Sequence, residues 1–218
     1  PVNGGPLPKA APKSGRWRYE PKINEWRAWV HPLSASMWNR HNEPLSITAE
    51  FAPVLARMQA WWQKHWPVNG PQWLDCGALS RRVPVGKGSL VLLDFAYDIQ
   101  APFDTRMQDL YQLFVQPANA EPIAQPWAFE QFVPPEHELL VFPYSYEDEA
   151  TQRADGATVI DPDLFPIAAW ERLQHINREL KCELFEGLVA KRADSLYPLQ
   201  LRSPEVEFPF WMKHRWQY

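Results

Sequence analysis

The sequence predicts a single α+β domain of mostly antiparallel sheets flanked by helices, preceded by a short arm. Three observations favour this class. The chain has 218 residues, 45% of them hydrophobic, which is enough for one sizeable core. Its 23 prolines break helices and favour short strands joined by defined loops. Helical and alternating hydrophobic patterns follow each other along the chain without an internal repeat.

The expected arm covers residues 1–15, which are rich in proline and glycine and show no hydrophobic periodicity. Residues 16–218 are expected to form the domain. Residues 1–18 contain four basic side chains and no acidic one, and the C-terminal "WMKHRWQY" is also basic. The net charge of −4 does not indicate a nucleic-acid binder, but basic ends on an acidic body are able to meet a phosphate backbone locally.

The first half of the domain alternates between strands and one long helix. Residues 17–31 and 36–40 have the composition of strands, and residues 51–66 place apolar side chains at helical spacing. Residues 72–83 and 88–99 then predict two strands. The second of these is almost entirely apolar, so it is expected to be central in its sheet.

The second half continues the alternation after a proline-rich stretch at residues 115–136, within which a short helix is expected at 127–132. The remaining elements are expected as helices at 105–114 and 166–180, and as strands at 138–144, 182–193 and 208–216.

Several classes of protein are disfavoured. No apolar run approaches the roughly 18 residues that a membrane span requires, and the N-terminus lacks the apolar core of a signal peptide. Cys76 and Cys182 show no metal-ligand spacing. We therefore expect reduced thiols and a cytoplasmic protein without membrane contact.

Charged residues on strands are the anomaly, because an unpaired buried charge is costly. Alternate residues of a strand share a face, so "YEPKINEWR" places Glu20 with Lys22, and "FPFWMKHRW" places Lys213 with Arg215. "LFEGLVAKR" adds another carboxylate and another lysine on a third strand.

Together these side chains suit an anionic phosphate ligand and a divalent ion. Like charges around Lys22 would lower its pKa, and the neutral amine could then attack phosphorus. Lys191, Lys213 and Arg215 would neutralise the phosphate, and Glu186 would bind the metal.

The same residues resemble the covalent nucleotidyltransferases, a family of ATP-dependent DNA ligases, RNA ligases and mRNA capping enzymes, with the ATP-dependent DNA ligases most similar. "EPKINEWR" resembles the first motif around the reactive lysine, and "MWNRHNEPLS" resembles the R-x-G element. "EGLVAK" matches E-G-x-V-x-K, and "WMKHR" resembles W-x-K-x-K. "LLDFAYDIQAPFDTRMQDL" and "DSLYPLQLRS" resemble two further segments, so the likeness covers residues 17–216.

The resemblance implies an ATP-grasp-like adenylation domain in which Lys22 forms lysyl-AMP with ATP and Mg²⁺ or Mn²⁺. It implies that Glu20 bounds the adenine, that Arg27 and Arg40 touch ribose and phosphate, and that Leu93 or Phe95 packs on the base. AMP would pass to a strand break in nicked duplex DNA, which is favoured over RNA, in DNA repair or replication.

Four features depart from the family pattern. Asn24-Glu25 replaces Asp-Gly in the first motif, "LDCGAL" lacks the glutamate of the third, and Leu93 replaces an aromatic residue before Asp94. The chain also ends directly after the fifth motif, without the OB domain, which a protein partner could supply. Two alternatives stay open: an RNA ligase, and a silent ligase-fold protein that binds nucleotide, nucleic acid or a protein.

Overall fold

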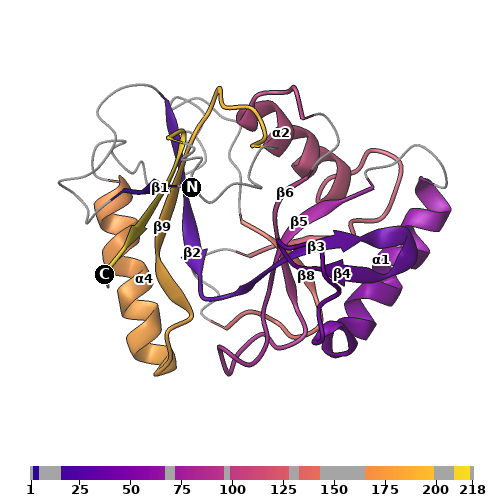
Figure 1. The fold of residues 1–218 in the computed structure, drawn as a ribbon, viewed down its shortest axis with the longest axis horizontal. Helices are drawn as coiled ribbons and strands as arrows, with labels where there is room; N and C mark the ends of the chain where they lie inside the picture. Colours follow the sequence, from indigo (N-terminus) through magenta and orange to yellow (C-terminus); the bar gives the residue numbers. More distant parts are fainter. Residues whose placement is uncertain are drawn as a thin grey trace.

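A computed structural model describes residues 2–4, 16–66, 72–95, 99–127, 133–142, 165–198 and 209–216. It contains a six-stranded sheet and a four-stranded sheet, each with helices on its outer side (Figure 1). The α+β class with predominantly antiparallel pairing is therefore confirmed. Three strand pairs are parallel, namely β1–β10, β6–β8 and β7–β8.

The six-stranded sheet has the order β4-β3-β5-β6-β8-β7. The predicted apolar strand is β6, and all six of its residues are buried between β5 and β8, which confirms its central place. The strands are β3 (Trp26–His31), β4 (Ser36–Trp38), β5 (Leu74–Ala78), β6 (Leu90–Phe95), β7 (Gln125–Pro126) and β8 (Leu139–Val141).

The four-stranded sheet has the order β1-β10-β9-β2 and joins both ends of the chain. Its strands are β1 (Val2–Asn3), β2 (Trp17–Ile23), β9 (Phe185–Arg192) and β10 (Trp211–Arg215). Residues 17–31 are thus two strands, because the chain leaves one sheet at Ile23 and enters the other at Trp26. The expected arm contributes β1, whose pairing partner lies about 210 residues away and leaves no periodic signal.

Helices cover the outer faces of both sheets (Figure 1). The short helices η1 (Pro32–Ser34) and η2 (Thr48–Phe51) precede α1 (Ala52–His65), and α2 (Phe103–Phe114) and α4 (Phe165–Leu180) follow. The expected strand at 138–144 is shortened to β8, and the short helix expected at 127–132 lies almost wholly outside the described residues.

Two apolar cores result from this arrangement. One packs α1 and α2 on the six-stranded sheet, with Phe51, Met58 and Trp62 fully buried. The other packs α4, through residues such as Leu173, on the outer face of the four-stranded sheet. No helix among the described residues is long and apolar enough to span a bilayer. The charged side chains of interest lie on the opposite face of the four-stranded sheet.

Candidate active site

One face of the four-stranded sheet carries most of the predicted site. Residues directly opposed in an antiparallel pair share a face. Lys22 on β2 and Arg215 on β10 both oppose Gly187 on β9. The same register places Glu20 and Lys213 opposite Val189, one step further along β9. The predicted residues that share this face are Glu20, Lys22, Lys191, Lys213 and Arg215.

Glu186 reaches this face through a β-bulge. The β2–β9 register shifts between Lys22 and Ile23, and Gly187 has a φ of +147°. A Cβ at Gly187 would lie 1.8 Å from the carbonyl oxygen of His214, so the position requires glycine. A bulge re-aims the neighbouring side chain. Glu186 Oε2 consequently lies 2.5 Å from Lys22 Nζ and 3.3 Å from Arg215 Nε.

Lys22, Lys213, Arg215 and Arg40 form what we call the cationic cluster. Burial lowers the pKa of Lys213, and the positive charges of Arg215, Lys22, Arg40 and Arg27 lower it further. Arg40 comes from the exposed turn after β4, where its Nε donates to His41 Nε2 at 3.0 Å. The structure therefore brings the cations of three predicted motifs within electrostatic reach of one lysine.

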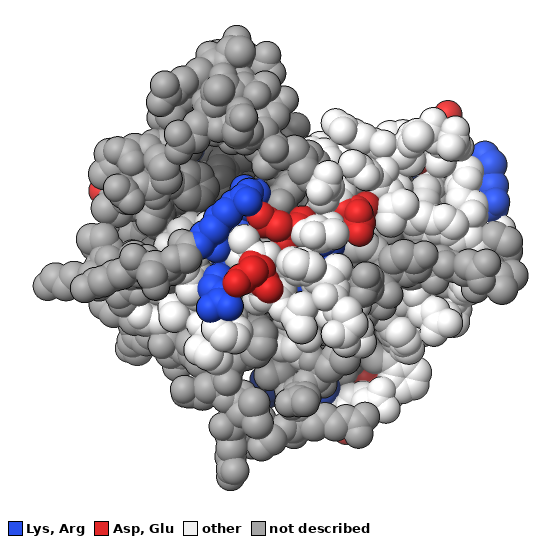
Figure 2. Space-filling model, turned by 90° about the horizontal axis from the view of Figure 1, so that it is seen from above, with Lys and Arg blue, Asp and Glu red and all other residues white. Residues whose placement is uncertain are grey.

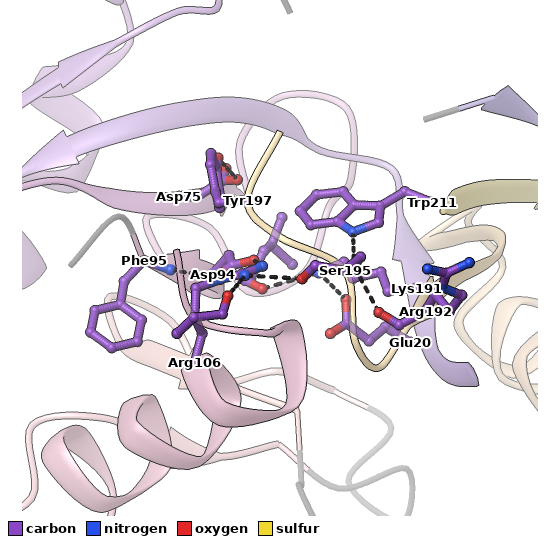
Figure 3. Close-up of polar contacts among 12 residues, drawn as sticks. Glu20, Asp75, Asp94, Phe95, Arg106, Lys191, Arg192, Ser195, Tyr197 and Trp211 are labelled. Carbon is purple, nitrogen blue, oxygen red and sulfur yellow. Dashed lines mark hydrogen bonds and ion pairs between the residues drawn. The ribbon is translucent and has the colours of Figure 1, made fainter. Parts of the chain in front are cut away.

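Deeper between the sheets lies a set of paired charges that we call the buried floor: Glu20, Lys191, Asp94 and Arg106. Lys191 is 3% exposed, and its Nζ contacts Glu20 Oε2 at 2.7 Å and donates to the Leu93 carbonyl at 3.1 Å (Figure 3). Burial raises the pKa of Glu20, and Lys191 opposes that rise. Lys191 thus joins β9 to β6, with its ammonium already engaged.

The second pair of the floor is the bidentate contact between Arg106 on α2 and Asp94 on β6, at 3.0 and 2.9 Å. Arg106 also donates to the carbonyl oxygens of Ala101 and Ser195. Ser195 Oγ in turn accepts from Trp211 Nε1 at 3.0 Å (Figure 3). This network fixes α2 against the strand that carries Asp94 and against the segment after β9.

Arg27 lies on β3, where the side chain is 39% exposed, and its guanidinium is paired with the buried Asp75. Tyr197 donates to the same carboxylate at 2.8 Å. Sequence reasoning treated Asp75 only as the remnant of an incomplete motif. Its alternation with apolar neighbours gave no further signal, because the arginine that it pairs with is distant in sequence.

Leu93 and Phe95, either of which the resemblance places against the base, belong to different cores and do not share a face of β6. The β5–β6 register shifts between Asp75 and Cys76, so simple alternation breaks at Leu93. Leu93 joins the core that contains Ile23 and Leu188, whereas Phe95 packs against Phe114, with ring centroids 5.9 Å apart. Phe95 points away from Asp94 and the buried floor (Figure 3).

Glu186 is the carboxylate best placed to take part in binding a divalent ion. Both of its ion pairs use Oε2, which leaves Oε1 for another ligand. Among the described residues, no group of three or more His, Cys, Asp or Glu side chains could hold a metal alone. Mg²⁺ is often bound through one or two carboxylates together with substrate phosphates, and a single carboxylate fits that pattern.

The charges at the start of β2 differ from the cationic cluster because they are locally balanced. A hollow of about 600 Å³ lies where β2 and α2 begin and is lined by Arg16, Asp104, Arg192 and Asp194 among others. Arg16 and Arg18 both pair with Asp104. Seen from above, basic and acidic side chains gather side by side on this face (Figure 2).

Comparison with known proteins finds the fold and not a family. No protein-family model and no curated protein matches the chain. Two solved structures, "Pmar-Lig_PreS3" and "Pmar-Lig_Pre", match with TM-scores of 0.53 and 0.51, at 13% and 14% identity. The matches cover 92% and 93% of this chain, but only 42% and 43% of theirs.

The ligase domain of M. tuberculosis LigD matches with a TM-score of 0.49 at 18% identity, over 91% of this chain and 53% of that one. The chain therefore spans about half the length or less of these structures. The predicted ligase-type nucleotidyltransferase fold is confirmed by the two structures with TM-scores above 0.5.

Proposed function

We propose that this chain is the adenylation unit of an ATP-dependent polynucleotide ligase, with Lys22 as its nucleophile. The observation that carries the proposal is the placement of Lys22 Nζ 2.5 Å from Glu186 Oε2, inside the cationic cluster. A lysine held by one carboxylate and surrounded by arginine and lysine suits attack on a phosphate. The ligase-like fold is consistent with this chemistry.

The first step transfers AMP to the chain. The Lys22 ammonium loses a proton, for which Glu186 is the nearest described acceptor. The free amine attacks the α-phosphorus of ATP, an N–P bond forms, and the bond from that phosphorus to the bridging oxygen breaks. Pyrophosphate leaves with the bond electrons, and lysyl-AMP remains.

The cationic cluster supplies the electrostatic part of this step. Lys213 and Arg215 face the same side of the sheet as Lys22, so they are placed to compensate negative charge that develops on the phosphate. Glu186 Oε1 would hold a divalent ion, Mg²⁺ or Mn²⁺, which supplies further charge neutralisation when bound. Leu93 and Glu20 remain the proposed contacts of the base.

The second half of the reaction delivers AMP to a nucleic acid. The 5′-phosphate of a nick attacks the α-phosphorus of lysyl-AMP, the N–P bond breaks, and Lys22 regains a proton. The adjacent 3′-hydroxyl then attacks the activated 5′-phosphate and releases AMP. We propose nicked duplex DNA as the substrate, in repair or replication, in the cytoplasm, with a protein partner and with Arg27 and Arg40 near phosphate.

The test is covalent labelling. The protein is incubated with ATP labelled at the α-phosphate and Mg²⁺ or Mn²⁺, and is then resolved on a denaturing gel. We expect label that acidic hydroxylamine releases, and we expect none with Lys22→Ala. Lys64→Ala, which changes an exposed lysine on α1, serves as the matched control and should label normally.

A folded wild-type protein that takes no label from any nucleotide would contradict the proposal and leave the binding-module alternative. Where label forms, the labelled protein is chased with nicked duplex DNA and with nicked duplex RNA. Faster loss of label and sealing on DNA supports the DNA assignment, and the reverse supports the RNA ligase.

A further inference from the structure

The N-terminal strand β1 lies beside the strand that carries two members of the cationic cluster. It pairs in parallel with β10, and Asn3 is opposed to Lys213. The Gly4 amide then donates to the Lys213 carbonyl oxygen at 2.9 Å. On its other side Lys213 is opposed to β9, so the backbone of this lysine is held between two strands.

The sheet order makes β1 the outer support of β10. β1 stands at the end of the order β1-β10-β9-β2 and pairs with β10 alone among the described strands. Without β1, β10 would become an edge strand with a row of unpaired backbone groups. Lys213 and Arg215 share one face of the sheet with Lys22, so a displacement of β10 would move both cations relative to that lysine.

The contact between β1 and β10 is close because residue 4 is glycine. A Cβ built on Gly4 would lie 2.4 Å from Cε1 and 2.7 Å from Nδ1 of His214. His214 is fully buried, so its ring has little room to move aside. Gly4 does not have a positive φ, so the position requires glycine for space and not for backbone conformation. A side chain at residue 4 would therefore displace β1.

The two contacts of Gly4 lie on different sides of β10. Successive residues of a strand point to opposite faces, so His214 lies on the face opposite the Lys213 side chain. Gly4 has no side chain of its own to offer a ligand. Any effect that it has on a phosphate must therefore pass through the position of Lys213.

We propose that Gly4 is a positioning residue, which packs β1 against His214, donates to the Lys213 carbonyl and thereby sets where the Lys213 ammonium meets the phosphate. The inference rests on the proposed function, in which Lys213 compensates charge on the α-phosphate. Lys22 and Glu186 are held by β2 and β9, so they stay in place when β1 is displaced. The opposite ends of the sequence thus cooperate in one step of the reaction.

The experiment measures the rate of lysyl-AMP labelling of the full chain, with urea denaturation on the same preparations. Gly4→Ala should slow labelling about tenfold relative to wild type, because a small displacement of a catalytic cation is costly. Gly88→Ala is the matched control in the loop between β5 and β6, because its Cβ would also meet a histidine ring, 2.3 Å from His137 Nδ1. The control should label at the wild-type rate.

Two double variants separate positioning from a general loss of structure. In a Lys213→Met background, Gly4→Ala should change labelling by less than about twofold, because the ammonium through which it acts is absent. In a His214→Ala background the effect should also be less than about twofold, because the added methyl group has room. A merely structural role would lower labelling in the Lys213→Met background as strongly as in wild type.

Hydrogen exchange measures the displacement of β1 without reference to activity. Gly4→Ala should speed exchange of the β10 amides and leave those of β5 and β6 unchanged. Unchanged exchange in β10, undiminished labelling by Gly4→Ala, or equal losses with and without Lys213 would each overturn the positioning role and leave the proposed function intact. A folded wild type that takes no label would overturn both.

Discussion

The cationic cluster and the buried floor lie on the same side of the four-stranded sheet, yet they treat charge in opposite ways. In the floor every described charge has an opposite partner, as in Glu20–Lys191 and Asp94–Arg106. In the cluster Lys22 and Arg215 both pair with one carboxylate, Glu186, and burial together with the like charges lowers the pKa of Lys213. The same residue types therefore hold the sheets together in one region and concentrate positive charge in the other.

The largest effect is expected in the floor, where Asp94→Ala strands the buried Arg106 guanidinium. Removing one partner of a buried ion pair costs about 3–5 kcal/mol of unfolding free energy. Urea denaturation measures it, with Arg16→Gln as the exposed control. Arg16 is 72% exposed and should change stability by less than about 0.5 kcal/mol. Equal losses for both variants would remove the distinction between paired floor and solvated surface.

The second prediction concerns Glu25, which belongs to neither region and whose buried Oε2 has no hydrogen-bond partner among the described residues. Its pKa rises from the ordinary 4.5 to about 7, so between these pH values the folded state binds a proton that the unfolded state lacks. Stability from this group is complete below pH 4.5 and is lost as pH rises to 7, by up to about 3 kcal/mol.

Glu25→Gln removes that titration. The variant should therefore lose less stability than wild type between pH 5 and pH 8 in urea denaturation. Taking the difference between the two proteins cancels the groups that they share, including Arg27, Lys22, Asp75 and Lys191. Parallel pH profiles would show that Glu25 titrates normally.

The fold was largely predictable because hydrophobic periodicity is local. The patterns at residues 51–66 and 88–99 each depend on side chains within one element, and α1 and β6 formed there. The break between β2 and β3 was missed because alternation continues through Asn24 and Glu25 while the chain changes sheets. Pairing of β1 with β10 was missed because it connects opposite ends of the sequence.

The site was predictable only as far as strand alternation and motif resemblance reach. They placed Lys22 and Lys213 on one face, which the register agrees with. Alternation failed at Leu93 and Phe95, where a bulge interrupts it. It also gave no sign that the Lys191 ammonium would be occupied by Glu20, since that contact depends on how two strands are aligned.

A third prediction tests whether the bulge creates the cluster. Gly187→Ala places a Cβ 1.8 Å from a backbone oxygen at a φ of +147°, so β9 must shift. We expect a loss of about 2 kcal/mol in unfolding free energy and a larger loss of lysyl-AMP labelling, because Glu186 would no longer reach Lys22. Gly86→Ala is a matched control, because its φ of +63° is also positive but lies on a loop between β5 and β6.

If Gly86→Ala reduces labelling as strongly as Gly187→Ala, the loss of labelling is explained by a general loss of structure. The orientation of the Glu186 side chain toward Lys22 would then not be its cause. Stability and labelling are therefore measured on the same preparations. If Gly187→Ala is destabilised but labels normally, lysyl-AMP formation does not require the bulge.

The smallest expected effect on stability concerns Lys213, whose surroundings differ most from those of the paired charges in the buried floor. Burial and neighbouring positive charges lower the pKa of Lys213, so the charged form of this side chain is destabilised in the folded protein. Lys213→Met keeps the length of the side chain and removes the charge. It should raise unfolding free energy slightly, by less than about 1 kcal/mol, while lowering the labelling rate about 10- to 100-fold.

Lys191→Met, in the floor, should instead destabilise the protein because it leaves Glu20 buried without its partner. Opposite signs for two lysines on one face would follow directly from their partners. If both variants destabilise equally, Lys213 has a structural partner in the folded chain, and the cluster is not poised for an anion.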